Sequence, residues 1–364
     1  MNMQRIAVIG AGIAGLTVAL RRATAGDQVV IFEAASKVGG QLESELRAGL
    51  VIEHGAEGFV ARSEAVPALA VEAGIADHVV EQLEQRSFRF DGSALIELAP
   101  GEAGRLLGFQ VPSDELGRGI RSFWRGMGEL PERLAAALGS QVELRLNSPV
   151  KSLAPNANGV TVLGDFGDLE AVDFDGAVIA TTARSAAALL GDAFGPTARA
   201  LQDSSLLSSL TVNLAFRREH IQHALDGTGF IVPEPEQLGG VRAVTFCSSK
   251  LPNRAPSTHA LLRLFFRPSD HDLRALSDGA WAERAERALA RALPVSGSAE
   301  HTIVSRWPSA LPVVDAAHRA RISSLEAALV GRRIWLAGAA FHGSGIDAAI
   351  RSAESAAQLI ASRG

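Results

Sequence analysis

The first forty residues alternate between short apolar runs and glycine-rich turns. Residues 6–9 are an apolar run that predicts a buried strand, and an amphipathic helical pattern begins a few residues later. Between the two stand Gly10, Gly12 and Gly15. A second apolar run, residues 29–32, ends at Glu33. This order of strand, glycine-rich turn, helix, strand and acid is typical of a βαβ unit that binds a dinucleotide.

Each part of this unit has a physical role. Gly10 permits a tight turn, Gly12 lets the backbone approach a pyrophosphate, and Gly15 lets the helix pack closely on the strand. The pyrophosphate is expected at the positive end of the helix dipole, where backbone N–H groups are free. Glu33 can accept hydrogen bonds from a ribose 2′-OH and would repel a 2′-phosphate. The motif alone does not separate NAD from FAD.

The rest of the chain predicts mixed α and β structure. Helices are expected at 64–75, 129–138 and 281–293, and a hairpin at 88–98 turns at Asp91 and Gly92. Strands are expected at 141–147, 160–174, 176–182, 205–216, 241–266 and 334–339. The last of these is followed by Gly343, Gly345 and a terminal helix. Segments at both ends of the chain are therefore expected to contact the nucleotide, and a separate sheet is expected between them.

Several segments resemble FAD-dependent amine oxidases and, more specifically, protoporphyrinogen oxidases. Residues 33–42 are similar to the E-A-x-x-x-x-G-G-x-x segment of these families, and residues 122–134 to R-G-G-M-G-x-L-P-x-x-L. Residues 245–266, the Arg306-Trp307-Pro308 run and the glycine-containing close at 336–354 are also similar. The resemblance implies an α/β fold with two parts. The first is a Rossmann-type FAD-binding domain made of residues 1–62, 140–184 and 330–364. The second is an α+β, mixed-sheet substrate part made of residues 63–139 and 185–329, with a shortened helical cap around 99–122.

The resemblance also implies which residues contact a non-covalently bound FAD. They are Gly10, Gly12, Ile13, Ala14, Gly15, Glu33, Ala34, Gly39, Gly40, Gln41, Gly55, Ala56, Glu57, Val150, Thr181, Trp307, Gly338, Gly345, Ile346 and Ala349. On residues alone, Trp307 also fits plain packing on the second sheet. The glycines of the C-terminal segment let the backbone approach a flat ligand, and the terminal helix aims its dipole at one edge of it.

Candidate catalytic and substrate residues come from the same segments. His342 is the candidate for proton transfer, with a backbone-bonded loop histidine as the alternative, and His54 is a second candidate. The candidate substrate contacts are Phe59, Arg105, Lys250 and Phe341. Lys250 could pair with a substrate carboxylate, but a surface ion pair is the favoured interpretation of this residue. No metal site is expected, and no dedicated acid or base is required, because a flavin itself accepts the hydride.

Composition narrows the function. The 364 residues carry a formal net charge of −5, so the chain lacks the excess of basic residues that is typical of a nucleic-acid-binding protein. Cys247 is the only cysteine, which excludes an internal disulfide and favours a reducing compartment. No signal peptide or membrane-length apolar run is recognised, so a cytoplasmic protein without stable membrane insertion is expected. A homodimer is compatible with the sequence. No second nucleotide fingerprint is found, which favours O2 or a quinone over NAD(P)H as the redox partner.

Three functions stay open at this stage. The first is a porphyrinogen oxidase, and the second is a related flavin oxidase or desaturase that acts on a smaller amine or heterocycle. The third is an FAD-binding scaffold without turnover. Most of the family's long helical insertion before residue 123 is missing, which favours a smaller or more open substrate site. The chain contains no tyrosine, which argues against the aromatic cage of a simple amine oxidase.

Overall fold

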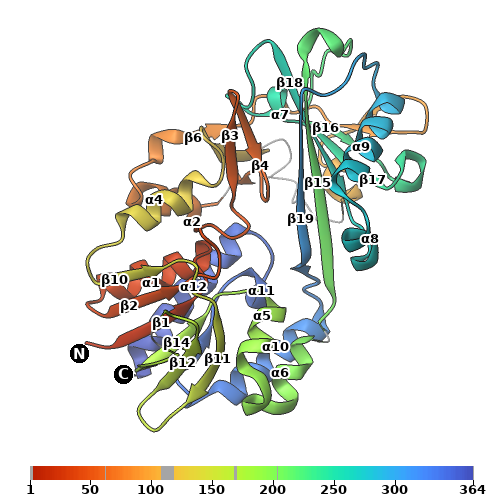
Figure 1. The fold of residues 1–364 in the computed structure, drawn as a ribbon. Coiled ribbons are helices and arrows are strands. Elements are labelled where there is room, and N and C mark those ends of the chain that lie inside the picture. Colours follow the sequence, from red (N-terminus) through yellow and green to blue (C-terminus); the bar gives the residue numbers. More distant parts are fainter. Residues whose placement is uncertain (1–2, 62, 108–118, 168–169, 203, 364) are drawn as a thin grey trace.

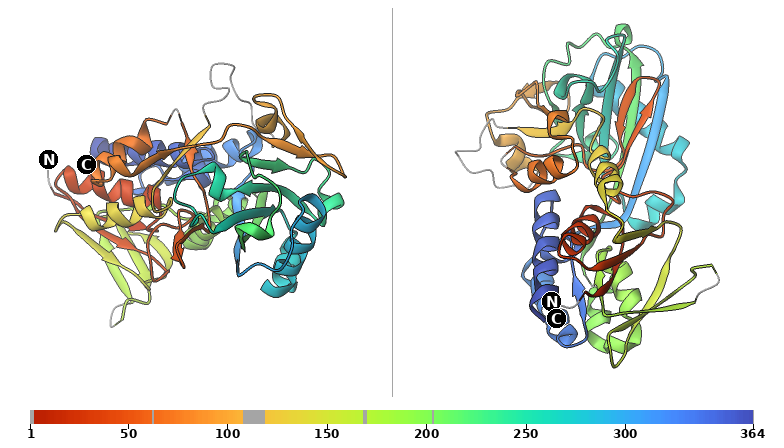
Figure 2. Two further views of the ribbon diagram at one scale, coloured as in Figure 1. Left: turned by 90° about the horizontal axis from the view of Figure 1, so that it is seen from above. Right: turned by 90° about the vertical axis from the view of Figure 1, so that its left-hand side faces the viewer.

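A computed structural model describes residues 3–61, 63–107, 119–167, 170–202 and 204–363. Figure 1 shows a lower part that holds both ends of the chain and an upper part built on a long sheet. The two views of Figure 2 agree that the termini lie side by side. Two long strands, β15 (Leu206–Arg217) and β19 (His301–Pro312), run from the upper part down to the lower part.

The lower part is centred on a parallel five-stranded sheet. The strand order is β10 (Val142–Arg145), β2 (Gln28–Phe32), β1 (Arg5–Ile9), β14 (Gly176–Ile179) and β20 (Ile334–Leu336). All four neighbouring pairs are parallel. Their apolar residues are buried on both faces, as expected for a parallel sheet covered by helices.

Helices cover both faces of this sheet. One face packs against α1 (Ile13–Thr24), α2 (Ala65–Glu72), α4 (Glu129–Ala137) and α12 (Ile346–Arg363). The other face packs against α5 (Ala183–Leu190), α6 (Gly195–Gln202) and α10 (Ala316–Leu329). The three-stranded meander of β11 (Val150–Pro155), β12 (Val160–Gly164) and β13 (Ala171–Phe174) packs there too.

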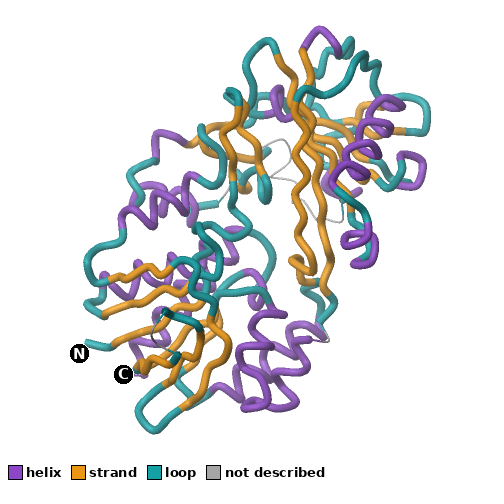
Figure 3. The backbone as a smooth tube through the Cα atoms, in the orientation of Figure 1, coloured by secondary structure: helices purple, strands orange, loops and turns teal. Residues whose placement is uncertain are grey.

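The upper part contains a seven-stranded mixed sheet. Its order is β19, β15, β18 (His259–Phe266), β17 (Val241–Phe246), β16 (Gly229–Ile231), β7 (Phe88–Phe90) and β8 (Leu95–Glu97). One face forms an apolar core with α9 (Asp278–Ala292) and α8 (Asp270–Ala275). Figure 3 shows these helices on one side of the sheet only. The opposite face is therefore left for other contacts.

Short elements connect the two parts. The pair β3 (Ser44–Arg47) and β4 (Leu50–Glu53) forms a hairpin. The strands β5 (Phe59–Val60), β9 (Ile120–Phe123) and β6 (Val79–Glu81) form a small sheet. Three short helices complete the fold: α3 (Glu102–Leu106), α7 (Cys247–Lys250) and α11 (Ala339–His342). Among the described residues, no helix is both long and apolar enough to cross a membrane.

The predicted fold class, a Rossmann-type unit joined to a mixed-sheet part, is confirmed. The domain limits stay a proposal. The structure packs α2 and α4 against α1 and α12, and α5, α6 and α10 under the same parallel sheet. The expected cap around 99–122 falls partly on residues 108–118, which lie outside the described residues; α3 and β9 flank them.

Candidate functional site

The carboxyl ends of the parallel strands meet at one edge of the lower sheet. Gly10 follows β1, Glu33 follows β2, Thr181 comes shortly after β14, and Gly338 comes shortly after β20. Ligands of open α/β sheets bind outside this edge. Four of the residues singled out in the sequence are thus brought to one place.

Gly10 and Gly15 are fixed by steric contact inside the protein. Gly10 has φ +106°, and a Cβ there would lie 2.7 Å from the Ala180 carbonyl oxygen. A Cβ on Gly15 would lie 1.9 Å from the carbonyl oxygen of Gly10. These two glycines therefore serve the tight turn and the close approach of α1 to β1.

Gly12 differs from them, because its side-chain position is open. It is the N-cap of α1 with an ordinary φ of −73°, and no side chain caps the helix there. A Cβ on Gly12 would meet only the Gly39 carbonyl oxygen, at 4.0 Å. The first turn of α1 thus offers N–H groups and free space together, which is what a pyrophosphate requires.

The paired glycines of residues 39–40 lie against this turn. Gly39 N–H donates to the Ala11 carbonyl at 2.9 Å, and the two segments form an isolated bridge between Gly12 and Gly39. A Cβ on Gly40 would lie 3.5 Å from the Cα of Gly12. Next along the chain, Gln41 Nε2 donates to the Ala310 carbonyl of β19 at 3.1 Å.

Glu33 is held by backbone donors at the end of β2. Its Oε2 accepts from Ala11 N–H at 2.7 Å, and its Oε1 accepts from Ala35 N–H at 2.8 Å. Each carboxylate oxygen can accept further hydrogen bonds. The carboxylate is therefore fixed in place while it keeps the capacity to bind ribose hydroxyls.

The C-terminal segment closes the same site. Gly338 has φ +115°, and a Cβ there would lie 3.3 Å from the Cβ of Ala14 in α1. Gly345 precedes α12 with φ +95°, and a Cβ there would meet no atom within 4 Å. Ala349 N–H donates to the Gly345 carbonyl at 3.1 Å as the first turn of α12 forms. The open glycine before a helix N-terminus fits the flat, electron-accepting ring of a flavin.

The segment of residues 53–57, which begins at the last residue of β4, is fixed by the seven-stranded sheet. Trp307 Nε1 donates to the His54 carbonyl at 2.7 Å, and Arg263 Nη2 donates to the Gly55 carbonyl at 2.5 Å. His54 Nδ1 lies 2.8 Å from the Ser305 hydroxyl. The sheet face opposite α8 and α9 therefore lies over this segment. Ala56 N–H also donates to the Gln41 carbonyl at 3.1 Å, which joins the segment to the paired glycines.

Two family models match the chain. The flavin containing amine oxidoreductase model matches residues 101–361, and the NAD(P)-binding Rossmann-like domain model matches residues 8–73. The chain belongs to the flavin containing amine oxidoreductase family. It is an FAD-dependent oxidoreductase, and the glycine cradle and open helix ends described above fit this cofactor.

Curated relatives of this flavin family member carry one recurrent name. A coproporphyrinogen III oxidase from Staphylococcus aureus is 22% identical over 98% of both chains. One from Bacillus subtilis is 27% identical over 202 residues, which cover 55% of this chain but 40% of the relative. A provisionally assigned protoporphyrinogen oxidase from Exiguobacterium has a similar crystal structure, with a TM-score of 0.82 at 21% identity over the whole of both chains. Putrescine oxidase bound to putrescine superposes with a TM-score of 0.73 at 16% identity, again over the whole of both chains.

Lys250 and Glu57, both singled out in the sequence, form an ion pair between α7 and the 53–57 segment of this family member. Their side chains are 13% and 18% exposed. Burial pushes the pKa of Glu57 upward, but Lys250, Arg263 and Arg254 outweigh it and hold that pKa below its ordinary value. Lys250 is therefore already paired, and a substrate carboxylate would have to compete with Glu57.

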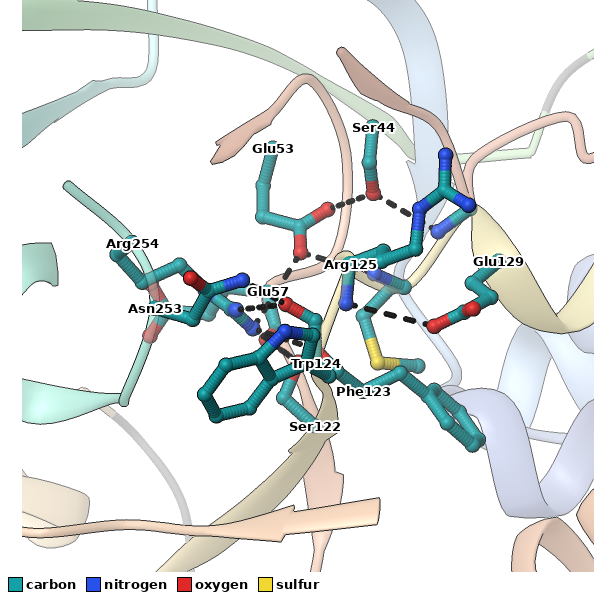
Figure 4. A network of polar contacts seen from close by, with 12 residues as sticks. Ser44, Glu53, Glu57, Ser122, Phe123, Trp124, Arg125, Glu129, Asn253 and Arg254 are labelled. Atoms are coloured by element: carbon teal, nitrogen blue, oxygen red, sulfur yellow. Dashed lines mark hydrogen bonds and ion pairs between the residues drawn. The ribbon is translucent and has the colours of Figure 1, made fainter. Parts of the chain in front are cut away.

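Sequence reasoning missed a buried polar network next to this pair, drawn in Figure 4. Glu53 accepts from Met127 N–H at 2.9 Å and from the Ser44 hydroxyl at 2.6 Å, with Arg254 3.8 Å away. Arg254 also donates to the Ser122 hydroxyl at 2.7 Å. Burial raises the pKa of Glu53 and lowers the pKa of Arg254. The network ties β4, the Gly126–Met127–Gly128 turn and the connection between α7 and β18 into one unit.

His342 contacts two helix side chains, and one of them, Ser352, also accepts from Gly338 N–H at 2.9 Å. The Nδ1 of His342 lies 2.7 Å from the Ser352 hydroxyl of α12, and its Nε2 lies 2.8 Å from Glu326 of α10. Both partners line a groove of about 630 Å³ between these helices and β20. Its proposed proton-transfer role stays a prediction, and these contacts favour a positioning role for α12.

The remaining candidates are spread over several places. Phe59 is buried in the core around α1, and Phe341 is buried in the core on the opposite face of the lower sheet. Arg105 is exposed on α3. Val150 begins β11, at the side of the lower sheet that carries the meander. Phe59 and Phe341 thus belong to different cores, and the substrate roles of Phe59, Arg105, Lys250 and Phe341 stay predictions.

Cys247 is buried at the start of α7 with apolar neighbours that include Ile52 and Leu261. Burial, reinforced by the charge of Glu57, raises the pKa of its thiol to about 12. Such a thiol is neutral at neutral pH and a poor nucleophile. This environment agrees with the packing role expected for Cys247.

Proposed function

We propose that this flavoenzyme is a porphyrinogen oxidase, which removes hydride equivalents from a reduced tetrapyrrole and passes the electrons to O2 or a quinone. The observation that carries the proposal is the position of the 53–57 segment. It lies between the glycine cradle, through Gln41, and the face of the upper sheet opposite α8 and α9, through Trp307 and Arg263. The name shared by the curated relatives supports the tetrapyrrole as substrate.

The protein's own residues supply position and electrostatics for this reaction. When bound, FAD supplies the hydride acceptor. The N–H groups of the first turn of α1 would hold its pyrophosphate, Glu33 its ribose, and the N-terminus of α12 the edge of the ring that becomes more negative on reduction. The Arg263 clamp holds the carbonyls of His54 and Gly55 in a fixed place beside this site.

Anaerobic flavin reduction tests the proposal. Coproporphyrinogen III and protoporphyrinogen IX, each prepared by chemical reduction, are mixed with the oxidised holoenzyme, and the oxidised-flavin band is followed. We expect rapid bleaching, recovery on admission of O2, and formation of the fluorescent porphyrin. NADPH, for which the sequence shows no second nucleotide fingerprint, serves as a control that should bleach the band slowly or not at all.

A smaller amine or heterocycle is the second candidate substrate class. The absence of tyrosine disfavours an amine-oxidase cage, whereas the short connection between β8 and β9 favours a more open site than a long cap would leave. A panel of amines in the same assay separates the candidates. Bleaching by an amine but by neither porphyrinogen would replace the proposal with this alternative.

A further inference from the structure

The loop of residues 338–345 joins β20 to α12 and contains three glycines in the left-handed region. Gly338, Gly343 and Gly345 have φ values of +115°, +129° and +95°. Glycine permits this backbone conformation but does not enforce it, because it has more conformational freedom than any other residue. The loop therefore depends on contacts with its surroundings to keep one geometry.

Ser352 of α12 contacts both ends of α11, the short helix in the middle of this loop. Its Oγ accepts from Gly338 N–H, the N-cap of α11, at 2.9 Å. The same oxygen lies 2.7 Å from Nδ1 of His342, the last residue of α11. Ser352 is buried, and it lies about 9 Å beyond Ile346 along the helix axis at about 1.5 Å per residue. One hydroxyl thus ties the turn after β20 to the second turn of α12.

The donors and acceptors of this contact form one consistent chain. Because Gly338 N–H is the donor to Ser352 Oγ, the hydroxyl proton of Ser352 is free to be donated to His342 Nδ1. The proton of the imidazole is then on Nε2, which lies 2.8 Å from Oε1 of Glu326 in α10. A carboxylate on one ring nitrogen fixes the tautomer and the orientation of a histidine. Glu326 therefore orients His342, and His342 orients the Ser352 hydroxyl.

The other side chains of the loop offer no polar anchor. Within residues 338–345, all of which the structure describes, no side-chain hydrogen bond involves Ser344, and Phe341 is buried among apolar residues. His342 is therefore the residue of this described loop whose side chain fixes it to the neighbouring helices by hydrogen bonds.

The chain of hydrogen bonds ends at the residues that fit the cofactor. A Cβ on Gly338 would lie 3.3 Å from the Cβ of Ala14, in the first turn of α1, where the pyrophosphate is placed. The N-terminus of α12, which Ser352 ties to Gly338, is placed at the ring edge that becomes more negative on reduction. The interaction of a charge with a helix terminus falls off within about one turn. A small displacement of α12 would therefore weaken it.

We propose that Glu326, His342 and Ser352 are positioning residues for the flavin. They hold the N-terminus of α12 at a fixed distance from the Gly338 turn and thereby favour the reduced, more negative form of the cofactor. The inference rests on the proposed placement of the flavin ring and is independent of the substrate. It gives His342 a role that differs from the proton transfer expected from the sequence, because His342 acts through Ser352.

FAD affinity and the two-electron reduction potential of the bound flavin test the proposal. Ser352→Ala removes the shared oxygen, so we expect oxidised FAD to bind about threefold to tenfold more weakly, and the affinity for reduced FAD to fall by a further factor of about five. That further factor corresponds to a potential lower by about 20 mV. The potential is measured by equilibration with a reference dye during slow reduction, which needs no substrate. Ser355→Ala, an exposed serine that lines the same groove, is the matched control and should change neither quantity.

Two substitutions of His342 separate the roles of its two ring nitrogens. The amide oxygen of an asparagine can take the place of Nδ1 and accept from Ser352, whereas the longer glutamine places its amide near Nε2 and Glu326. We therefore expect His342→Asn to keep the wild-type potential and His342→Gln to lower it as Ser352→Ala does. Glu326→Ala should lower the potential by a smaller amount, because Glu326 only orients His342.

A merely structural role would lower the melting temperature of the variants and leave the potential of the bound flavin unchanged. An unchanged potential in folded, FAD-containing Ser352→Ala and His342→Gln proteins would therefore overturn the proposal, and so would an equal decrease in His342→Asn and His342→Gln. Where Ser352→Ala retains no FAD, the comparison of the two His342 variants decides. Anaerobic mixing of wild type with coproporphyrinogen III reports on the proposed function separately. Its failure to bleach the flavin would remove the porphyrinogen substrate without affecting the measured potentials.

Discussion

Arg263 donates from Nη2 to the carbonyl oxygen of Gly55 at 2.5 Å, which joins the centre of the upper sheet to the segment after β4. The side chain is almost fully buried, and its Nε and Nη1 have no partner among the described residues. A buried cation with unsatisfied donors is costly unless neighbouring charges compensate it. Here the nearby carboxylate of Glu57 feels its charge.

Removal of the Arg263 guanidinium should therefore loosen the 53–57 segment. We expect Arg263→Leu to lower the free energy of unfolding by about 2 kcal/mol, because the Gly55 carbonyl loses its donor and Glu57 loses a cation. FAD affinity should fall as well. Urea unfolding and FAD titration measure both effects, with Arg287→Leu as the exposed control. Unchanged FAD affinity in a folded Arg263→Leu variant would contradict the idea that Arg263 holds the 53–57 segment in place for the cofactor.

The contrast between this clamp and the glycine turn explains what the sequence could predict. Gly10, Gly15 and Glu33 act within one local βαβ unit, so their spacing along the chain is enough to identify them. Arg263 contacts a residue 208 positions away. Glu53, Arg254 and Ser122 are brought together from three separate segments in the same way. No local pattern marks such residues, because their partners are set by tertiary packing.

Strand β19 shows a second limit. Its residues 301–312 include polar side chains and Pro308, and they lack the regular alternation of a half-buried strand. The strand lies at the sheet edge, where proline is tolerated, and a bulge shifts its register opposite Leu207 and Ser209. Sequence reasoning recognised Trp307 there only through the family resemblance. Its hydrogen bond to the His54 carbonyl is a finding of the structure.

Gly12 and Gly15 allow FAD binding to be separated from folding. Gly12→Val has room within the protein and an ordinary φ, so we expect a folded protein with little bound FAD, since the side chain would fill the pyrophosphate position. Gly15→Ala should unfold at a markedly lower temperature, because its Cβ would clash with the Gly10 carbonyl. Circular dichroism melting and the flavin-to-protein absorbance ratio distinguish the two. A yellow Gly12→Val protein would refute the assignment of the pyrophosphate site.

Cys247 should be inert in the native protein. Its thiol is buried with a pKa raised to about 12, so alkylation by iodoacetamide at pH 8 should be slow until the protein is unfolded. Acid precipitation should release the flavin into the supernatant from wild type and from Cys247→Ala alike. Flavin retained on precipitated wild type, but released from Cys247→Ala, would instead identify a covalent link at this residue.

The Lys250–Glu57 pair should make stability depend on pH in the acidic range. The folded pKa of Glu57 lies below its unfolded value of about 4.3, so the pair contributes fully above that value and is lost as pH falls through the folded pKa. Glu57→Gln alone should destabilise the protein near neutral pH, because it leaves the largely buried Lys250 without its partner. The double variant Glu57→Gln/Lys250→Met should recover much of this loss. It should also lose less stability than wild type between pH 6 and pH 3.

The titration of Glu53 must be separated from that of Glu57, because the pKa of Glu53 is shifted in the opposite direction. Its pKa is raised by burial, so the native protein binds this proton more tightly, and the Glu53 contribution to stability declines as pH rises from about 4.3 through the folded pKa. The pH series is therefore measured by urea unfolding in a Glu53→Gln background as well as in wild type. In that background the difference in unfolding free energy between the protein with Glu57 and the double variant should be constant above about pH 4.3 and should change as pH falls below that value. If wild type and the double variant lose stability in parallel on acidification in both backgrounds, the ion pair does not contribute to folding.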